Sequence, residues 1–318
     1  MAHMIETMAW TGPTPWHGLG VQVDPDISTD DMLVTAGLDW DVEKTPLFAT
    51  MGDQTVSIPT HTALTRSSDG KVLSVVGAGY QPVQNREALE FFRTFVEAGD
   101  MTLETAGSLG GGKRIWALAS LRDGFELDGG DAVQGYLLLT NPHTPNAALV
   151  AQFTPIRVVC ANTMAMALAG ESAEIYRHAH FTTFDADRAK AALGLARHQL
   201  ADFHEASAFL ASKRSTDEMV RRFFVEVFEP VRSVNDDIES LVRLPRVQRA
   251  LDALTVQPGA ELRSSEGTWW GAVNAVTWLA DHKFGRSADT RLSSAWYGEA
   301  RQFKLRALAK ALDYARAA

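Results

Sequence analysis

The sequence predicts an α+β fold, with a mainly antiparallel sheet and helices on one face in the N-terminal part and a helical C-terminal part. Up to about residue 157, apolar runs of strand length alternate with glycine-rich turns. From about residue 183, apolar residues recur at every third or fourth position, which is the period of an amphipathic helix. The expected order β-β-α-β-β-β-(β)-α suits a sheet covered by helices.

The first strands are expected between Phe48 and Tyr80, where Pro59 interrupts the run and Ser68-Asp69-Gly70 makes a hairpin turn. Asn85 is the expected N-cap of a helix that stops at Gly99. Further strands are predicted over residues 101–106, 114–121, 133–140 and 148–153, followed by a helix over 162–168.

The C-terminal part begins with an expected helix of about 27 residues, capped by Asp185. Its apolar residues lie on one stripe, which we expect to be an interface between subunits: Leu193, Leu200, Phe203 and Leu210. More helices are predicted over 217–228, 234–254, 268–281 and 300–315. The expected division is an acidic arm (1–46), an α+β core domain (47–182) and a helical domain with a basic last helix (183–318).

The composition is that of an ordinary globular protein of 318 residues, 46% of them hydrophobic and 22% charged. Its single cysteine, Cys160, excludes an internal disulfide and a thiolate zinc cage. The first residues lack the features of a secretory signal, and no window is apolar enough to span a membrane. We therefore expect a cytoplasmic protein of a bacterial host cell, without cofactor or membrane contact.

Charge is distributed unevenly along the chain, whose formal net charge is −9. Residues 1–60 hold nine acids and one base, whereas residues 283–318 hold eight bases and three acids. Because binding of a polyanion responds to local patches, the acidic total does not exclude a nucleic-acid partner.

The segment Gly107-Ser-Leu-Gly-Gly-Gly-Lys-Arg114 matches the phosphate-loop pattern G-x-x-x-x-G-K, but Arg114 stands where a hydroxyl should hold magnesium. An apolar run follows the segment, while a phosphate loop leads into a helix. The interpretation we favour is a glycine-rich hairpin that displays Lys113 and Arg114.

No histidine spacing on a helix suits a metal, so we expect none. His178 and His180 would share a face only if their segment is a strand. Asn141, His143 and Asn162 form a candidate polar site, and with Arg157 they define the enzyme alternative. Trp16 and His17 lie in a Pro/Gly-rich segment and are expected to anchor it at an interface.

Several segments together resemble the phage/plasmid-like family known as domain of unknown function 932. They are Pro15-Trp-His-Gly-Leu-Gly20, Gly79-Tyr-Gln-Pro-Val-Gln-Asn85, Glu104–Leu109 with Arg114–Leu118, Leu138–Asn141, Phe153–Thr163, Trp270–Thr277 and Ser294–Gly298. The resemblance implies a gene carried by phages or plasmids and brings no catalytic residues. The expected β-β-β-α order is also similar to the core of single-strand-annealing recombination proteins, which form rings or filaments.

The leading hypothesis is a non-enzymatic homo-oligomer, ring or filament, that binds single-stranded DNA of a mobile element in recombination, replication or DNA protection. The residues expected to contact phosphates or bases are Lys113, Arg114, Trp116, Arg157, Lys304, Arg306 and Lys310. The alternatives are a protein-binding factor that counters a host defence, and an enzyme with an unrecognised polar site.

Overall fold

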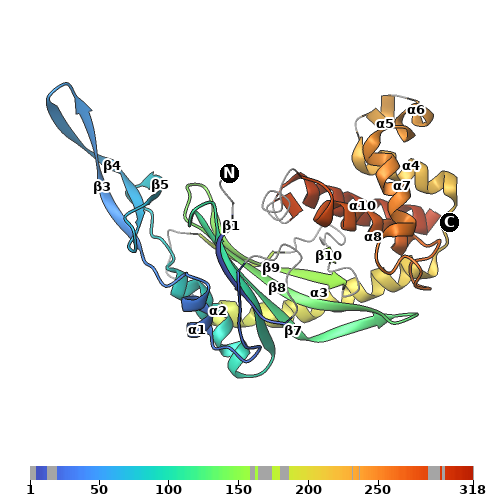
Figure 1. Cartoon of the computed structure of the whole chain (residues 1–318), viewed down its shortest axis with the longest axis horizontal. Coiled ribbons are helices and arrows are strands. Elements are labelled where there is room, and N and C mark those ends of the chain that lie inside the picture. The colour runs from blue at the N-terminus through green and yellow to red at the C-terminus, as the bar shows by residue number, and fades with distance from the viewer. Residues whose placement is uncertain are drawn as a thin grey trace. The chain divides into compact units, whose positions relative to one another are not determined.

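The computed structural model describes residues 5–12, 20–157, 162–163, 174–179, 186–230, 232–235, 237–285, 294–295 and 298–317 (Figure 1). The strands are β1 (Ile5–Trp10), β2 (Val21–Gln22), β3 (Val42–Met51), β4 (Gln54–Arg66), β5 (Val72–Gly77), β6 (Met101–Leu109), β7 (Arg114–Leu127), β8 (Asp131–Pro142), β9 (Ala148–Arg157), β10 (Asn162–Thr163) and β11 (Glu174–Ala179). The helices are α1 (Thr29–Thr35), α2 (Asn85–Glu97), α3 (Ala186–Ser212), α4 (Asp217–Phe228), α5 (Arg232–Asn235), α6 (Ile238–Val242), α7 (Pro245–Val256), α8 (Trp269–His282) and α10 (Glu299–Ala317).

The chain divides into two compact units, and β7, β8, β9 and α3 each contribute residues to both. The first unit comprises residues 1–122, 136–152 and 174–196, and the second comprises residues 123–135, 153–173 and 197–318. The described part of residues 1–46 belongs to the first unit, where β1 pairs with β6.

The larger sheet has the strand order β10-β9-β8-β7-β6-β1-β2, with β11 also paired to β9. The pairings β1–β6, β6–β7, β9–β10 and β9–β11 are antiparallel, and the short β1–β2 pairing is parallel. Gly107 lies where β6 approaches β1, and a β-carbon there would lie 2.5 Å from the carbonyl oxygen of Thr7. Glycine is therefore required at this position for the two strands to pair.

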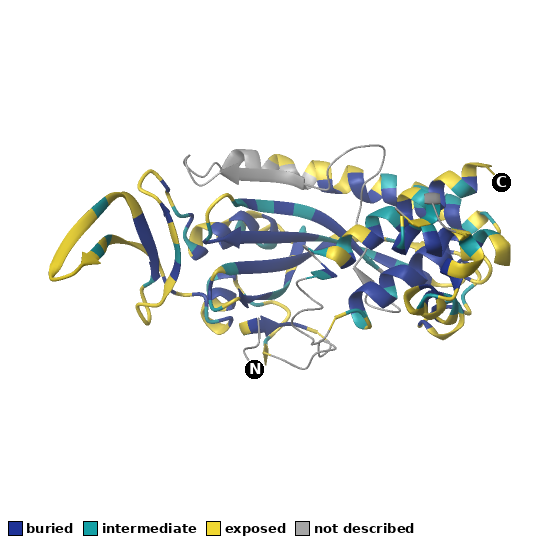
Figure 2. Cartoon of the chain, turned by 90° about the horizontal axis from the view of Figure 1, so that it is seen from above, coloured by how far each residue is buried: buried dark blue, intermediate teal, exposed yellow. Residues whose placement is uncertain are grey.

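The smaller sheet has the order β3-β4-β5 and contains a long hairpin. β5 pairs with β4 only over His61–Thr65, so the outer half of the β3–β4 hairpin is two-stranded. The hairpin stands away from the rest of the first unit (Figure 1), and its outer half is exposed on both faces (Figure 2). Its register shifts between Pro46 and Phe48, so β4 continues through Pro59 with an irregularity there. The expected interruption at Pro59 is thus corrected to a bulge within one strand.

In the first unit, α1 and α2 pack against β6. α2 buries Leu89, Phe91, Phe92 and Phe95, whose three- and four-residue spacing makes one apolar face. The helix starts at Asn85, the predicted cap, and the observed N-cap is Gln84, whose backbone N–H donates to Oε2 of Glu87 at 2.8 Å.

The helical part of the second unit is organised around α8, which packs against α7 and α10. Nearly every residue of α8 is buried, including Trp269 and Trp270, as expected of a helix that is apolar on all sides. The α+β fold class and the helical C-terminal region are confirmed. The predicted helix over 234–254 is instead divided into α5, α6 and α7. Pro245 is the first residue of α7, where its missing N–H costs nothing because the first N–H groups of a helix have no partner within the helix.

Candidate functional site

The glycine-rich segment forms the turn between β6 and β7. Leu109 pairs with Arg114 across it, and Gly110–Gly112 have φ values of 62°, 70° and 84°. This left-handed backbone is strained for any residue with a β-carbon. Because the turn leads into a strand and not into a helix, the prediction of a hairpin is confirmed and the phosphate-loop geometry is missing.

The turn packs closely against side chains from the β4–β5 turn and its surroundings. A β-carbon at Gly111 would collide with Nζ of Lys71. A β-carbon at Gly112 would lie 3.3 Å from both Nη1 of Arg66 and Cζ2 of Trp40. Because these glycines have no side chains, Lys71, Arg66 and the indole ring of Trp40 can pack directly against the turn.

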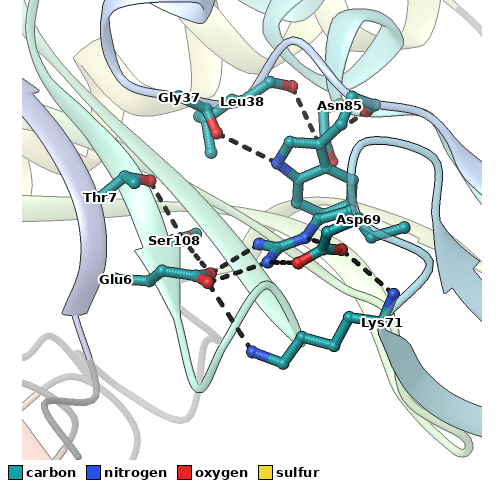
Figure 3. A network of polar contacts seen from close by, with 10 residues as sticks. Glu6, Thr7, Gly37, Leu38, Asp69, Lys71, Asn85 and Ser108 are labelled. Carbon is teal, nitrogen blue, oxygen red and sulfur yellow. Dashed lines mark hydrogen bonds and ion pairs between the residues drawn. The ribbon is translucent and has the colours of Figure 1, made fainter.

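Arg66 is the centre of a polar network at this turn (Figure 3). Its guanidinium donates to both carboxylate oxygens of Glu6, at 2.8 and 3.0 Å, and its Nε donates to Oδ1 of Asp69 at 2.9 Å. Nζ of Lys71 lies 3.7 Å from Glu6, and Oγ of Ser108 donates to the same carboxylate at 3.2 Å. The network ties β1, β4 and β6 together through charge-assisted hydrogen bonds.

These contacts shift the acid–base properties of the network. Burial alone would raise the pKa of Glu6, but the hydrogen bonds and positive charge of Arg66, with the charge of Lys71, lower it overall. The pKa of Asp69 falls to about 2, chiefly because the Arg66 side chain donates a hydrogen bond to its carboxylate. A hydrogen bond from the backbone N–H of Lys71 lowers it further. The pKa of Arg66 is raised by the hydrogen bonds to Asp69 and Glu6. Each carboxylate therefore keeps its charge to a lower pH than it would in the unfolded chain.

Trp40 connects this network to a buried polar group. The Arg66 guanidinium carbon lies 5.5 Å from the centre of the indole ring. The centres of the Trp40 and His143 rings are 5.6 Å apart in a T-shaped arrangement. Nδ2 of Asn85 donates to the carbonyls of Leu38 and Trp40, at 3.0 and 3.2 Å. Its Oδ1 therefore acts as the acceptor for Nε2 of His143 at 2.9 Å, which assigns the imidazole proton to Nε2.

Two of the three residues of the candidate polar site lie together. Asn141 and His143 flank Pro142 at the end of β8, and Nδ2 of Asn141 donates to the carbonyl of Val83 at 2.9 Å. Both side chains are buried, so the pair is sealed within the first unit. Asn162 belongs to the second unit, and its side chain lies outside the described residues. Asn85, which sequence reasoning missed as a partner of His143, is 58 residues distant along the chain.

The residues expected to contact DNA differ in how exposed their side chains are. Lys113 is exposed and Arg114 is half-buried, next to the glycine turn. Trp116, expected to stack on bases, is 2% exposed, so that expectation is wrong: its ring is part of the core. The side chain of Arg157 lies outside the described residues.

The three cations of α10 that were expected to contact DNA are engaged within the second unit. Lys304 is 1% exposed and pairs with Asp281 at 2.8 Å, which corrects its assignment as a phosphate contact. Burial lowers the pKa of Lys304, and the Asp281 charge opposes that effect. Nε of Arg306 donates to the Val227 carbonyl at 2.8 Å, and Nζ of Lys310 pairs with Glu226 at 3.0 Å.

The stripe predicted as an interface is also internal. Leu200, Phe203 and Leu210 are buried in the second unit, where the Phe203 ring lies 6.0 Å from that of Trp270. The stripe packs against its own chain, so its assignment as a subunit interface is corrected. The Leu193 side chain lies outside the described residues, as do Trp16, His17, Cys160 and His180.

Two hollows lie in the second unit. One of about 660 Å³ is lined by α4, α7 and residues 260–268, and one of about 650 Å³ by α4 and α10. Of the residues predicted from the sequence to act in binding, Lys310 lines the second hollow and none lines the first.

Across the described ranges, no three His, Cys, Asp or Glu side chains gather as a metal ion would require. In the same part of the chain, no helix is long and apolar enough to cross a membrane.

Comparison with protein families gives one result. Residues 72–296 match the model of a family described as Domain of unknown function (DUF932). No curated protein and no solved structure matches the chain. The matched range includes the glycine turn, the buried His143–Asn85 pair and most helices of the second unit.

Proposed function

Since the chain belongs to the DUF932 family, whose description names no activity, we propose from its own residues that it binds single-stranded DNA through the glycine turn. The observation that carries the proposal is the exposed Lys113 at the tip of this turn. Lys113 makes no ion pair with any described residue, so its charge is available to a phosphate.

Other cations gather around the same turn. We call Lys71, Lys113 and Arg114 the turn patch; Lys71 contacts the turn at Gly111, and Arg114 begins β7. Arg66 adds a fourth cation below the surface, and Glu6 and Asp69 supply two carboxylates, which leaves a positive local balance. Phosphates are attracted by such local charge even on an acidic chain.

The turn patch is held in place by groups that DNA need not touch. The Lys113 carbonyl accepts the backbone N–H of His143 at 2.8 Å, and the Arg66 network fixes the neighbouring β4–β5 turn. The cations therefore sit on a rigid hairpin, which lowers the entropy lost on binding. The patch has no exposed aromatic ring of its own, so the expected binding is independent of base sequence.

The enzyme alternative is less well supported by the described residues. His143 and Asn85 are buried and hydrogen-bonded to each other, so they offer no accessible group to a substrate. A role of the chain in a mobile element, in recombination, replication or DNA protection, remains part of the proposal.

The test measures binding of a fluorescent oligo-dT by anisotropy at several salt concentrations. The double variant Lys113→Ala/Arg114→Ala should weaken binding about equally for all sequences and reduce the log–log salt slope by roughly 0.7 for each lost phosphate contact. The control Arg221→Ala/Arg249→Ala removes the same charge from exposed positions on α4 and α7 and should change neither quantity. Absence of binding at about 50 mM salt, or equal losses in both variants, would contradict the proposal.

A further inference from the structure

Lys71 is held differently in the polar network from its neighbour Arg66. Its ammonium lies 3.7 Å from Oε1 of Glu6, which is beyond hydrogen-bond distance, and 43% of its side chain is exposed (Figure 3). The Arg66 side chain is 11% exposed and donates hydrogen bonds to two carboxylates. Lys71 is therefore the loosely held cation of this network, and Arg66 is the fixed one.

The backbone at Lys71 is fixed although its side chain is exposed. The Lys71 N–H donates to Oδ1 of Asp69 at 3.1 Å, and the Lys71 carbonyl accepts the N–H of Arg66 at 3.0 Å. From this closed turn the long side chain reaches the glycine turn at Gly111. The ammonium can thus change partners by side-chain rotation alone, without movement of either turn.

The carboxylate of Glu6 has other partners besides Lys71. Arg66 donates to both of its oxygens, at 2.8 and 3.0 Å, and Oγ of Ser108 donates at 3.2 Å. A carboxylate left without a partner would oppose the departure of Lys71, because an unpaired charge is unfavourable where water is partly excluded. Glu6 would keep these three hydrogen bonds after the ammonium leaves, so the exchange leaves no unpaired charge behind.

A phosphate at the turn patch would be a closer partner for Lys71. Hydrogen bonds between an ammonium and an anionic oxygen are typically about 2.7–2.9 Å long, shorter than the contact with Glu6. We propose that a DNA phosphate replaces Glu6 as the partner of the Lys71 ammonium, so that Glu6 competes with DNA and limits the affinity of the turn patch. This inference rests on the proposed function and adds a residue that regulates it.

The exposure of the Lys71–Glu6 contact sets the size of the effect. Water screens an exposed ion pair, so its loss changes an equilibrium by at most about fivefold. Glu6→Gln should therefore tighten the binding of oligo-dT by up to about fivefold, because Lys71 no longer has to leave a carboxylate. Lys71→Ala should weaken binding, because one phosphate contact is lost.

A double-mutant cycle measured by fluorescence anisotropy at about 50 mM salt tests the competition. Glu6→Gln should tighten binding in the unaltered chain and have a smaller effect in a Lys71→Ala chain, where there is no ammonium to release. The matched control is Asp69→Asn, which also removes one negative charge from Arg66 but contacts Lys71 through its backbone N–H. It should tighten binding less than Glu6→Gln does, and by the same factor with and without the Lys71 side chain.

A pair of glycine variants tests the position of the ammonium. Alanine should be similarly strained at Gly110 and Gly111, since their φ values are 62° and 70°. The β-carbon at Gly111 would collide with Nζ of Lys71, whereas that at Gly110 would lie 3.8 Å from Cβ of Lys113. Gly111→Ala should therefore displace the ammonium and weaken oligo-dT binding more than Gly110→Ala does.

The outcomes separate this inference from the proposed function. If the unaltered chain does not bind oligo-dT, both are wrong. If it binds, an unchanged affinity in Lys71→Ala, an effect of Glu6→Gln that is independent of Lys71, or equal losses in the two glycine variants would overturn the competition alone. The proposed function would then stand, with Lys113 and Arg114 as its contacts. Circular dichroism of every variant should show that affinities are compared among folded chains.

Discussion

Nζ of Lys304 on α10 donates to Oδ1 of Asp281 on α8 at 2.8 Å, with both side chains buried. Removing one partner of a buried ion pair leaves an uncompensated charge and typically costs about 3–5 kcal/mol. We predict that Lys304→Met lowers the free energy of unfolding by this amount, measured by urea denaturation. Its affinity for oligo-dT, measured where the variant is still folded, should be unchanged.

The double variant Lys304→Met/Asp281→Leu provides the control, because it removes both charges and keeps an apolar core. It should recover most of the lost stability, since apolar replacements of a buried pair are often neutral. A loss of DNA affinity by Lys304→Met at full stability would instead restore the phosphate contact expected from the sequence.

The Arg66 network should make stability depend on acid pH. Both Glu6 and Asp69 have pKa values below their ordinary values of 4.5 and 3.8, and that of Asp69 is about 2. When the folded-state pKa of an acid is lowered, the unfolded chain binds protons first as the pH falls. The stabilisation is therefore complete above about pH 4.5 and is lost as the pH falls toward 2.

Thermal melting of Glu6→Gln and Asp69→Asn between pH 7 and pH 2.5 measures this dependence. Each variant should melt below the unaltered chain at pH 7, and the gap should narrow steadily below pH 4.5. Asp53→Asn, at an exposed acid in the hairpin turn, should show no gap at any pH. A gap that widens toward acid pH would mean that the network does not stabilise the folded state.

Local patterns predicted the secondary structure well because their causes lie within a few residues. The sequence indicated a helix of about 27 residues after Asp185, and α3 has 27. It also indicated α4 with its observed bounds, which follow from Thr216 as N-cap and an apolar face that includes Phe223 and Phe224. Capping and periodicity are both local properties.

The candidate site depended on contacts that local patterns cannot specify. Glu6 and Arg66 are 60 residues apart, and nothing in either segment selects the other. Lys304 had a detectable signal: it shares a helical face with Ala300, Ala307 and Leu308, all of which are buried. A lysine on an apolar helical face is usually buried with an ionic partner. The excess of basic residues over 283–318 predicted a surface position for Lys304 because it ignores which face of the helix each residue occupies.

The hairpin reading of the glycine turn predicts that nucleotides do not bind there. A phosphate loop holds its anion with the N-terminus of the helix that follows, and here β7 follows. Adding 5 mM MgATP should therefore leave the melting temperature unchanged, because a ligand stabilises a protein only through preferential binding to its folded state. A magnesium-dependent rise that Lys113→Ala abolishes would contradict this reading.

The packing of the turn against Arg66 and Trp40 predicts a specific cost for Gly112→Ala. An alanine at the φ of 84° pays the left-handed backbone penalty of about 1–2 kcal/mol, and its β-carbon would also crowd Leu73, Arg66 and Trp40 at 3.2 to 3.3 Å. Gly130 has a similar φ of 82° with open space around the position of its β-carbon, so Gly130→Ala pays the backbone penalty alone. Urea denaturation should therefore show a larger loss of stability for Gly112→Ala, and equal losses would mean that the turn is not packed against the Arg66 network.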